Sequence, residues 1–308
     1  MIRLIEKHLI RIRELSREDI LDILDQAEAF HNILDRDIKK VPTLRGKVIV
    51  NLFFEPSTRT RTSFELAGKI LSADVVNISK STSSAVKGES LKDTALTIKS
   101  LGADFIIVRH THAGVPELLS RYGPFKVINA GDGAGEHPTQ ALLDLFTMRR
   151  KTGRLEDLSV TIVGDILHSR VARSNIYALT KLGARVNLVA PPTLLPRHIE
   201  QLGVHVYHHI EDVFDKTDVL YLLRIQLERQ KDSLFPSLRE YAKLYGVNGA
   251  RLAQFDRKVL VMHPGPINRG VEIGADVADS AISLIEEQVR NGVVVRMAIL
   301  FLMSRKSE

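Results

Sequence analysis

The chain of 308 residues contains no cysteine and no tryptophan. The lack of cysteine excludes disulfide bonds, thiolate metal ligands and a cysteine nucleophile. Long apolar runs are also missing, because no window approaches the ~20 apolar residues that a membrane-spanning helix needs. The first 19 residues mix charged and apolar side chains at helical spacing and do not resemble a signal peptide. We therefore expect a cytoplasmic protein without membrane contact.

The charge is unbalanced towards the basic side, with a formal net charge of +6 at pH 7. A basic protein suits an anionic partner, which can be a nucleic acid or a small phosphorylated or carboxylated substrate. Lysine and arginine are spread along the chain in short clusters such as residues 149–151, and aromatic residues do not interleave with them. We therefore expect small anionic substrates and no nucleic acid.

Two groups of histidines are candidates for metal binding, namely His110 with His112 and His205 with His208 and His209. Neither group has a carboxylate at the helical spacing of a zinc motif such as HExxH. The sequence therefore predicts no metal site.

The length favours two domains, and the hydrophobic pattern supports this division. Apolar, β-branched runs alternate with helical patterns in two series, at residues 47–53, 74–78, 104–109 and 126–130, and at 159–165, 185–190, 218–224 and 258–264. Unbroken apolar runs are typical of parallel strands buried on both faces. The predicted fold is α/β, with two domains that are each a parallel β-sheet flanked by helices. Ligands of such sheets gather beyond the carboxyl ends of the strands, so we expect the active site in the interdomain cleft.

The first strand runs into FFEPSTRTRTSFE at residues 53–65, where Ser57 is a natural helix N-cap. A helix start offers unpaired N–H groups and a positive dipole end, and hydroxyl groups and the Arg59 guanidinium add further donors. This combination suits a phosphate group. The simpler alternative is a capped surface helix with solvated arginines.

Nucleotide cofactors lack support in the sequence. A GxxxxGK[ST] phosphate loop is absent, and in GDGAGEH at residues 131–137 Glu136 occupies the place of the third glycine of a dinucleotide-binding motif. A nucleotide cofactor is therefore not expected.

The strand–PSTRTR–helix element resembles the carbamoyl-phosphate signature of the aspartate and ornithine carbamoyltransferase family. Further segments resemble family motifs in the expected order: KGESLKDT at 87–94, VRH with Arg109, HPTQ with His137 and Gln140, GDILHSR with Arg170, LLRIQLER with Arg224 and Gln226, and HPGPINRG at 263–270. The resemblance covers nearly the whole chain. It implies a carbamoyl phosphate-binding domain at 1–136, an aspartate-binding domain at 137–290, and a C-terminal helix at 291–308 that packs back on the first domain.

Several of these residues also have a chemical rationale of their own. His137 precedes Pro138 at a predicted helix start, so it can be a simple capping residue or a donor to a substrate carbonyl. Arg170 begins a helix after a strand, and Arg224 and Gln226 point the same way across one residue. Two arginines and an amide suit a dicarboxylate, although isolated arginines are more often solvated surface groups.

The resemblance implies transfer of the carbamoyl group of carbamoyl phosphate to the amino group of L-aspartate, a step of pyrimidine biosynthesis. The amine would attack directly, without a covalent enzyme intermediate. The resemblance assigns carbamoyl phosphate to Ser57, Thr58, Arg59, Thr60, Arg109, His137, Gln140, Pro264 and Gly265. It assigns aspartate to Lys87, Arg170, Arg224 and Gln226, and catalysis to Arg59, Thr60, Lys87, Arg109 and His137.

Further implications concern assembly and closure. Ser83 and Lys87 would come from a neighbouring subunit of a homotrimer with shared active sites. Glu55, beside the anion site, would pair with Arg170 or Arg229 when the domains close. The sequence leaves open whether a regulatory chain binds.

Two alternatives remain at this stage. Ornithine enzymes of the family characteristically carry His-Cys-Leu-Pro in the late loop, whereas this chain has His-Pro-Gly-Pro at residues 263–266; the missing cysteine and the Lys87 loop argue against ornithine. Some aspartate enzymes have leucine at the Gly265 position, where the family contact is made largely through the backbone. A non-catalytic phosphate-binding module would explain PSTRTR but not the second set of arginines.

Overall fold

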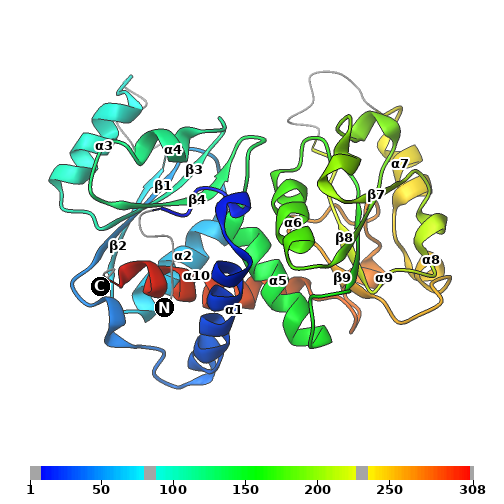
Figure 1. Ribbon diagram of the computed structural model, residues 1–308, viewed down its shortest axis with the longest axis horizontal. Helices are drawn as coiled ribbons and strands as arrows, with labels where there is room; N and C mark the ends of the chain where they lie inside the picture. The colour runs from blue at the N-terminus through cyan, green and yellow to red at the C-terminus, as the bar shows by residue number, and fades with distance from the viewer. Residues whose placement is uncertain (1–7, 80–87, 227–234, 306–308) are drawn as a thin grey trace. The chain divides into compact units, whose positions relative to one another are not determined.

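The computed structural model describes residues 8–79, 88–226 and 235–305 (Figure 1). The chain divides into two compact units, of which unit 1 holds residues 1–146 and 289–308 and unit 2 holds residues 147–288. The first division lies inside helix α5 (Pro138–Thr152), later than the boundary at residue 137 that the motifs suggest.

Unit 1 contains a four-stranded parallel sheet in the order β2-β1-β3-β4. Its strands are β1 (Val48–Phe53), β2 (Asp74–Ser79), β3 (Phe105–His110) and β4 (Lys126–Asp132). Each coincides with one of the apolar runs of the first series, so the predicted strands are confirmed. Strand β2 lies at the edge and is the least buried, because only one neighbour covers its side.

Helices cover both faces of this sheet (Figure 1). Unit 1 contains α1 (Arg17–His31), α2 (Thr58–Ile70), α3 (Leu91–Ser100), α4 (Val115–Leu119) and most of α10 (Ile285–Ser304). One core joins the β1 residues Val50 and Leu52 to Ile98 of α3 and Leu119 of α4. On the other face α2 approaches so closely that a side chain at Gly68 would meet Val75 at 2.7 Å. Sheet burial on two sides explains the near-continuous apolar strands.

Unit 2 contains a five-stranded parallel sheet in the order β7-β6-β5-β8-β9. The strands are β5 (Ser159–Val163), β6 (Arg185–Val189), β7 (His205–Tyr207), β8 (Val219–Leu222) and β9 (Leu260–Met262). The four predicted strands of the second series are confirmed. Strand β7 was not predicted, because a three-residue edge strand that begins with an exposed histidine carries little hydrophobic pattern.

The helices of unit 2 are α6 (Arg170–Lys181), α7 (Leu238–Tyr245), α8 (Gly249–Leu252) and α9 (Ala275–Ala278). Short 3-10 helices complete the two units: Ile12–Glu14, Asn32–Asp35, Pro42–Leu44, Pro192–Leu194, Ile199–Leu202 and Ile210–Val213. None of the helices in the described ranges is both long enough and apolar enough to span a lipid bilayer.

Strand direction decides where the motif residues of each unit lie. In a parallel sheet all carboxyl ends meet at one edge, so the segments after β1, β3 and β4 are neighbours, as are those after β5, β8 and β9. These segments carry the polar motifs that the sequence analysis singled out.

Candidate active site

The PSTRTR segment begins directly after β1 and is tied to the end of β3. Phe53 pairs with Arg109 in the sheet register, and the Phe54 amide donates to the Arg109 carbonyl at 2.9 Å. Ser57 occupies the N-cap position of α2, as predicted, but its side chain makes no capping hydrogen bond. The Ser57 hydroxyl is therefore available to a ligand at the helix start.

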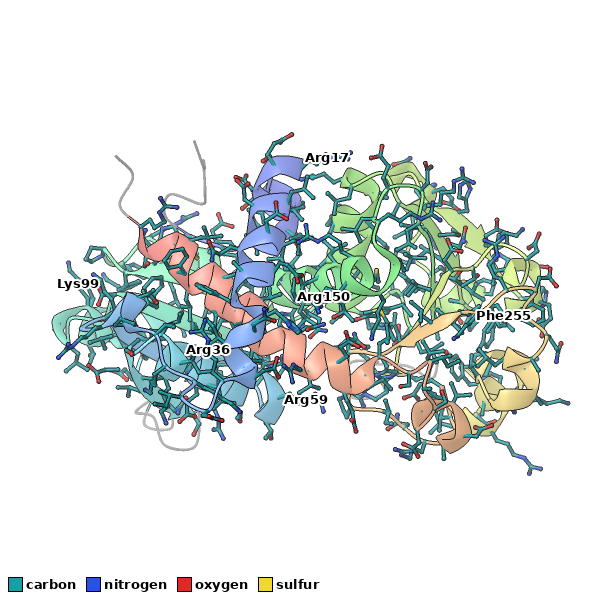
Figure 2. The ribbon with its side chains drawn as sticks, turned by 90° about the horizontal axis from the view of Figure 1, so that it is seen from below. Arg17, Arg36, Arg59, Lys99, Arg150 and Phe255 are labelled. Atoms are coloured by element: carbon teal, nitrogen blue, oxygen red, sulfur yellow. The ribbon has the colours of Figure 1, made fainter. Side chains whose placement is uncertain are left out.

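Arg59, which Figure 2 labels, stands in the first turn of α2. Thr60 belongs to the same turn. Thr60 is buried, with 6% of its surface exposed. Arg59 reaches solvent, and partial desolvation by the surrounding protein lowers the pKa of its guanidinium. Among the described residues no carboxylate pairs with Arg59. A cation that is partly desolvated and not neutralised favours an incoming anion.

Arg109 joins the end of β3 to the turn before α2. Its Nη2 donates to Glu55 Oε1 at 2.7 Å, and its Nη1 donates to the Ala130 carbonyl at 3.3 Å. This pairing was not predicted from the sequence, because it depends on the adjacency of β1 and β3. The prediction that Glu55 pairs with Arg170 or Arg229 when the domains close stays a prediction. Arg229 lies outside the described residues. Glu55 holds the Arg109 guanidinium in place beside the PSTRTR segment.

His137 and Gln140 lie at the start of α5, after β4. Both are buried, with 3% and 8% of their surfaces exposed. The His137 carbonyl accepts from the Gln140 amide at 3.0 Å, and the Gln140 side chain donates through Nε2 to Asp144 Oδ1 at 3.0 Å. Because Nε2 donates to Asp144, this contact fixes the orientation of the side-chain amide of Gln140.

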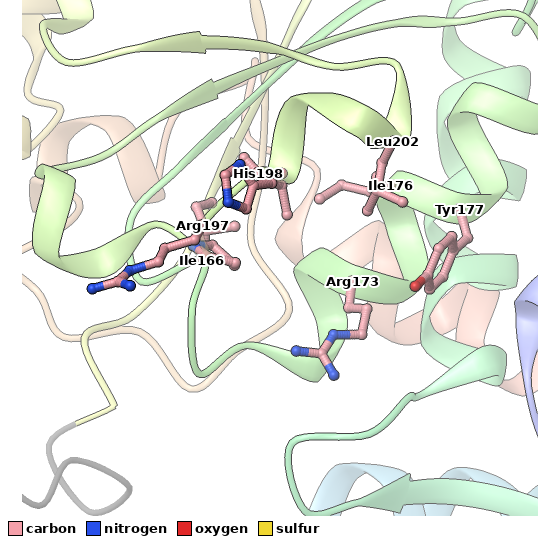
Figure 3. Close-up of a pocket in the computed structure, with 9 residues that line it drawn as sticks. Ile166, Arg173, Ile176, Tyr177, Arg197, His198 and Leu202 are labelled. Carbon is pink, nitrogen blue, oxygen red and sulfur yellow. The ribbon is translucent and has the colours of Figure 1, made fainter.

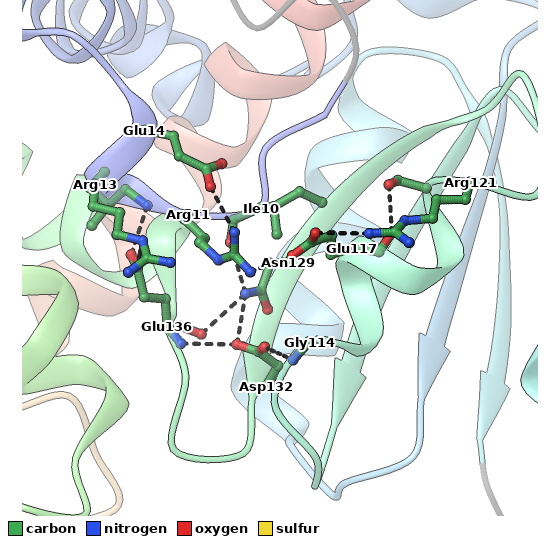
Figure 4. Close-up of polar contacts among 12 residues, drawn as sticks. Ile10, Arg11, Arg13, Glu14, Gly114, Glu117, Arg121, Asn129, Asp132 and Glu136 are labelled. Atoms are coloured by element: carbon green, nitrogen blue, oxygen red, sulfur yellow. Dashed lines mark hydrogen bonds and ion pairs between the residues drawn. The ribbon is translucent and has the colours of Figure 1, made fainter.

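A buried polar network holds the loop that leads to His137 (Figure 4). Asn129 Nδ2 donates to Asp132 Oδ1 at 2.9 Å, and the Glu136 amide donates to the same oxygen at 2.9 Å. Glu136 Oε2 in turn accepts from the Ile12 amide at 2.7 Å. Glu136 therefore anchors the loop to the N-terminal segment. From the sequence alone, this residue served only as evidence against a dinucleotide-binding motif. Satisfied buried networks of this kind restrict a loop to one conformation.

In unit 2 the segment after β5 lies against the segment after β8. The Leu223 amide donates to the Val163 carbonyl at 2.8 Å. Gly164 has a φ of +131°, and a side chain there would meet the Leu223 carbonyl oxygen at 2.6 Å. Only glycine permits this approach without strain. The two segments are thereby held in contact at the carboxyl edge of the sheet.

Asp165 organises these two segments. Its carboxylate is fully buried and accepts from His168 Nδ1 at 2.9 Å and from the Gln226 amide at 3.2 Å. Arg170 begins α6 behind the N-cap Ser169 and is buried, with 3% of its surface exposed, whereas Arg224 is partly exposed. The dicarboxylate set predicted from the sequence thus comes from neighbouring segments of one sheet edge.

The third segment of this edge follows β9. The His263 amide donates to Gln288 Oε1 at 3.0 Å, and His263 Nδ1 accepts from the Gly265 amide at 2.8 Å. Because Nδ1 accepts, the imidazole proton belongs on Nε2, which lies 3.2 Å from Glu272 Oε1. The loop that carries Pro264 and Gly265 is therefore held by a buried histidine and carboxylate.

Some predicted residues lie outside the described residues, namely Ser83, Lys87 and Arg229. The structure also reveals residues that the sequence analysis missed: Asp144, Asp165 and Glu272 each fix a segment that carries predicted site residues. For Asp165 the available signal was a carboxylate inside the GDILHSR motif. The contact of Glu272 with His263 joins positions nine residues apart, and no sequence signal marked it. In the described part of the chain no cluster of histidine and acidic residues is arranged to hold a metal ion.

Comparison with known protein families assigns both halves of the chain. Residues 7–150 match the carbamoyl-P binding domain of the aspartate/ornithine carbamoyltransferases, and residues 156–303 match their Asp/Orn binding domain.

Similar proteins and structures agree with this assignment. The chain is 58% identical to the aspartate carbamoyltransferase catalytic subunit of Heliobacterium modesticaldum over 297 residues, which cover 96% of this chain and 95% of the relative. It is 33% identical to the aspartate transcarbamoylase of Trypanosoma cruzi in complex with N-(phosphonacetyl)-L-aspartic acid, with a TM-score of 0.90 over 98% of this chain and 97% of that one. The catalytic subunit of M. jannaschii aspartate transcarbamoylase is 39% identical, with a TM-score of 0.85 over 96% and 97% of the two chains. The chain therefore belongs to the aspartate/ornithine carbamoyltransferase family.

Proposed function

We propose that the protein is an aspartate carbamoyltransferase, which converts carbamoyl phosphate and L-aspartate into N-carbamoyl-L-aspartate and phosphate. The observation that carries the proposal is the difference between the two sets of residues. Unit 1 presents a helix start with hydroxyl groups and Arg59, which suits a phosphate. Unit 2 presents Arg170, Arg224 and Gln226 at one sheet edge, which suits a dicarboxylate. Relatives that are 58% identical carry the same name.

The groups of unit 1 bind carbamoyl phosphate and stabilise charge on its carbonyl oxygen. Ser57, Thr58 and Arg59 hold the phosphate, and Thr60, Arg109 and His137 donate to the carbonyl oxygen. The buried positions of Thr60 and His137 support this role, because donors in a low-dielectric site stabilise developing charge more than donors in water. Arg109 is already oriented by Glu55.

Gln140 recognises the carbamoyl amide. Its Nε2 is engaged with Asp144, so its Oε1 is the atom left to accept from the carbamoyl NH2 group. Pro264 and Gly265 are further proposed contacts of carbamoyl phosphate through their backbone, and the buried contacts of His263 support a fixed backbone there.

Arg170 and Arg224 bind the two carboxylates of aspartate, with Gln226 as a further donor and Lys87 as a residue shared by both substrates. Partly buried arginines bind carboxylates through paired, charge-assisted hydrogen bonds. Asp165 supports the arrangement, because it holds the backbone at Gln226.

The reaction proceeds by direct attack of the neutral aspartate amine on the carbonyl carbon. A tetrahedral species forms and expels phosphate, so neither a covalent enzyme intermediate nor a cofactor is required. The departing phosphate is the proposed acceptor of the amine proton. The enzyme contributes orientation of the substrates and stabilisation of the oxyanion. The step belongs to pyrimidine biosynthesis.

The proposed assembly is a homotrimer in which Ser83 and Lys87 of one chain complete the site of the next. Closed rings of identical subunits use one repeated heterologous interface, which can place such a loop in a neighbouring site.

A parallel assay with two acceptors tests the proposed activity. When carbamoyl phosphate and L-aspartate are supplied, we expect the enzyme to release phosphate and to form carbamoyl aspartate. When L-ornithine replaces L-aspartate, we expect kcat/KM to be at least roughly 100-fold lower. An Arg59→Ala variant serves as the control that any activity belongs to this enzyme. Turnover of ornithine at the higher rate would identify the ornithine branch instead. Phosphate binding without turnover of either acceptor would identify a non-catalytic binding module.

A further inference from the structure

Unit 2 contains a cavity of about 220 Å3 that none of the proposed substrate contacts uses. It lies between α6 and the segment that leads into the 3-10 helix Ile199–Leu202 (Figure 3). Its apolar wall includes Ile166, Ile176 and Leu202, of which Ile166 and Ile176 are buried.

The polar part of the lining is cationic. Arg173 and Arg197 line the cavity with Tyr177 and His198, and none of the nine lining residues is acidic. Among the residues that the structure describes, neither Arg173 nor Arg197 has a carboxylate partner. In the view of Figure 3, Ile166 lies between the side chains of Arg197 and Arg173. Two guanidinium groups that no carboxylate of the lining neutralises give this cavity a positive potential.

The size limits the occupant. At about 30 Å3 per water molecule, the cavity holds roughly seven water volumes. This is less than the ~300–1,000 Å3 of pockets for drug-sized ligands. It suits one ring with one charged group. Tyr177 offers an aromatic face and a hydroxyl donor next to Arg173, which lies one helical turn earlier on α6.

We propose that this cavity binds a small organic anion, with an apolar ring against Ile166, Ile176 and Leu202 and a carboxylate or phosphate at Arg173. Its occupancy changes the affinity for aspartate, a consequence that rests on the proposed function. The binding itself does not depend on that function.

The coupling follows from the elements that the cavity shares with the predicted aspartate contacts. Ile166 is the neighbour of Asp165, whose carboxylate holds the Gln226 amide at 3.2 Å. Arg173 lies one turn after Arg170 on the same helix. A ligand that displaces Ile166 or the first turn of α6 therefore acts on Gln226 and Arg170 together. Coupling of this kind is reciprocal, because aspartate must change the affinity for the ligand by the same factor.

Direct binding is measured by calorimetry on the full-length protein. Phenyl phosphate and benzoate are the two aromatic probes, and they distinguish a phosphate from a carboxylate. Inorganic phosphate lacks the ring and benzyl alcohol lacks the charge, so these two serve as partial probes. We expect at least one aromatic anion to bind with a Kd on the order of 0.1–1 mM. The two partial probes should bind at least ~10-fold more weakly at the site defined by Arg173.

Four variants locate the bound probe. Arg173→Gln should weaken binding at least ~10-fold, whereas Arg239→Gln, which changes an exposed arginine of α7, should leave the Kd unchanged. Arg59→Ala and Arg224→Ala should also retain binding. Loss of binding in either of these two variants, with normal binding by Arg173→Gln, would place the probe at a proposed substrate site and overturn the proposal. So would the absence of binding by both aromatic anions. Thermal melting confirms that each variant is folded.

Steady-state kinetics measure the coupling between the cavity and the proposed aspartate site. A saturating aromatic anion should change the KM for aspartate about 2–10-fold in the wild-type enzyme and in Arg239→Gln, with no effect in Arg173→Gln. Binding with an unchanged KM would refute the coupling alone. A protein that binds the probe at Arg173 but has no carbamoyltransferase activity would refute the proposed function while the cavity assignment stands.

Discussion

Two arginines of unit 1 differ in how their charges are balanced before any substrate binds. Arg109 is oriented by Glu55 at 2.7 Å, whereas Arg59 has no carboxylate partner among the described residues. A guanidinium that already has a partner can serve as a fixed donor to a neutral carbonyl. One without a partner gains more from an anionic ligand, because the ligand supplies the missing counter-charge. This difference matches the proposed division between carbonyl and phosphate contacts.

Arg224 tests the proposed aspartate contacts at this scale. We expect Arg224→Ala to lose at least ~1.5–3 kcal/mol in kcat/KM for aspartate, because a charge-assisted contact to a carboxylate disappears. The Kd for carbamoyl phosphate should stay near the wild-type value. Steady-state kinetics and calorimetry measure the two quantities, with Arg239→Ala as the control. Unchanged kinetics with aspartate would remove Arg224 from the site.

Among the secondary-structure elements, α7 and α10 bury polar side chains that their sequences do not mark. Arg296 of α10 is 3% exposed, and its guanidinium lies 4.9 Å from the centre of the Phe64 ring of α2. Burial lowers the pKa of Arg296 to about 9, while the nearby Asp144 opposes the shift. Because Asp144 also accepts from Gln140, the packing of α10 reaches a proposed substrate contact.

Two tyrosines of α7 provide a stability test with a defined pH dependence. Tyr241 is buried, and within the described residues its hydroxyl has no hydrogen-bond partner; Tyr245, stacked on it at 5.2 Å, donates to the His208 carbonyl at 2.9 Å. At pH 7 we expect Tyr241→Phe to keep or raise the free energy of unfolding, since an unsatisfied hydroxyl is removed. Tyr245→Phe should lose about 1 kcal/mol with its hydrogen bond.

Above pH 10, Tyr241→Phe should resist alkaline unfolding better than the wild type. Burial raises the pKa of Tyr241, with further contributions from Glu272 and Asp165. Below pH 10 the phenol is neutral in both states and contributes no pH dependence. Above pH 10 the unfolded chain loses this proton while the folded protein keeps it, so stability falls by up to ~1.4 kcal/mol per pH unit. Urea unfolding between pH 9 and 11 measures the free energy of unfolding of the wild type and of Tyr241→Phe. An equal dependence of this free energy on pH in the two proteins would contradict the raised pKa of Tyr241.

For the whole molecule the central prediction is that sites are shared between chains. Arg59→Ala and Lys87→Ala trimers should each be nearly inactive. After dissociation, mixing in equal amounts and reassociation, a site is intact only when its Arg59 side comes from the Lys87 variant and its Lys87 side from the Arg59 variant. Random assembly in a closed ring therefore restores about a quarter of wild-type activity.

The control for this experiment is native mass spectrometry, which must show that subunits have exchanged. If sites were built within single chains, every site would keep one defect, and mixing would restore no activity despite complete exchange.

The sequence by itself determined the features that depend on neighbours along the chain. Unbroken apolar runs marked eight of the nine strands described, and Pro56, Ser57 and Pro138 marked the starts of α2 and α5. Such signals are local, because strand and helix patterns repeat within a few residues. The ordered motifs were equally visible and predicted the family, which the comparisons confirm.

Only the tertiary structure decided which distant residues meet. Glu55 pairs with Arg109 because β1 and β3 are adjacent, and the carboxylate of Asp165 meets the Gln226 amide because β5 and β8 are adjacent. No spacing in the sequence encodes either pairing, since the strand order of a sheet is set by packing of the whole unit. The cavity beside Arg173 also depends on tertiary packing, because the 3-10 helix Ile199–Leu202 lies beside α6 although strand β6 separates them in the sequence. The physical reason is the removal of apolar side chains such as Ile176 and Leu202 from water.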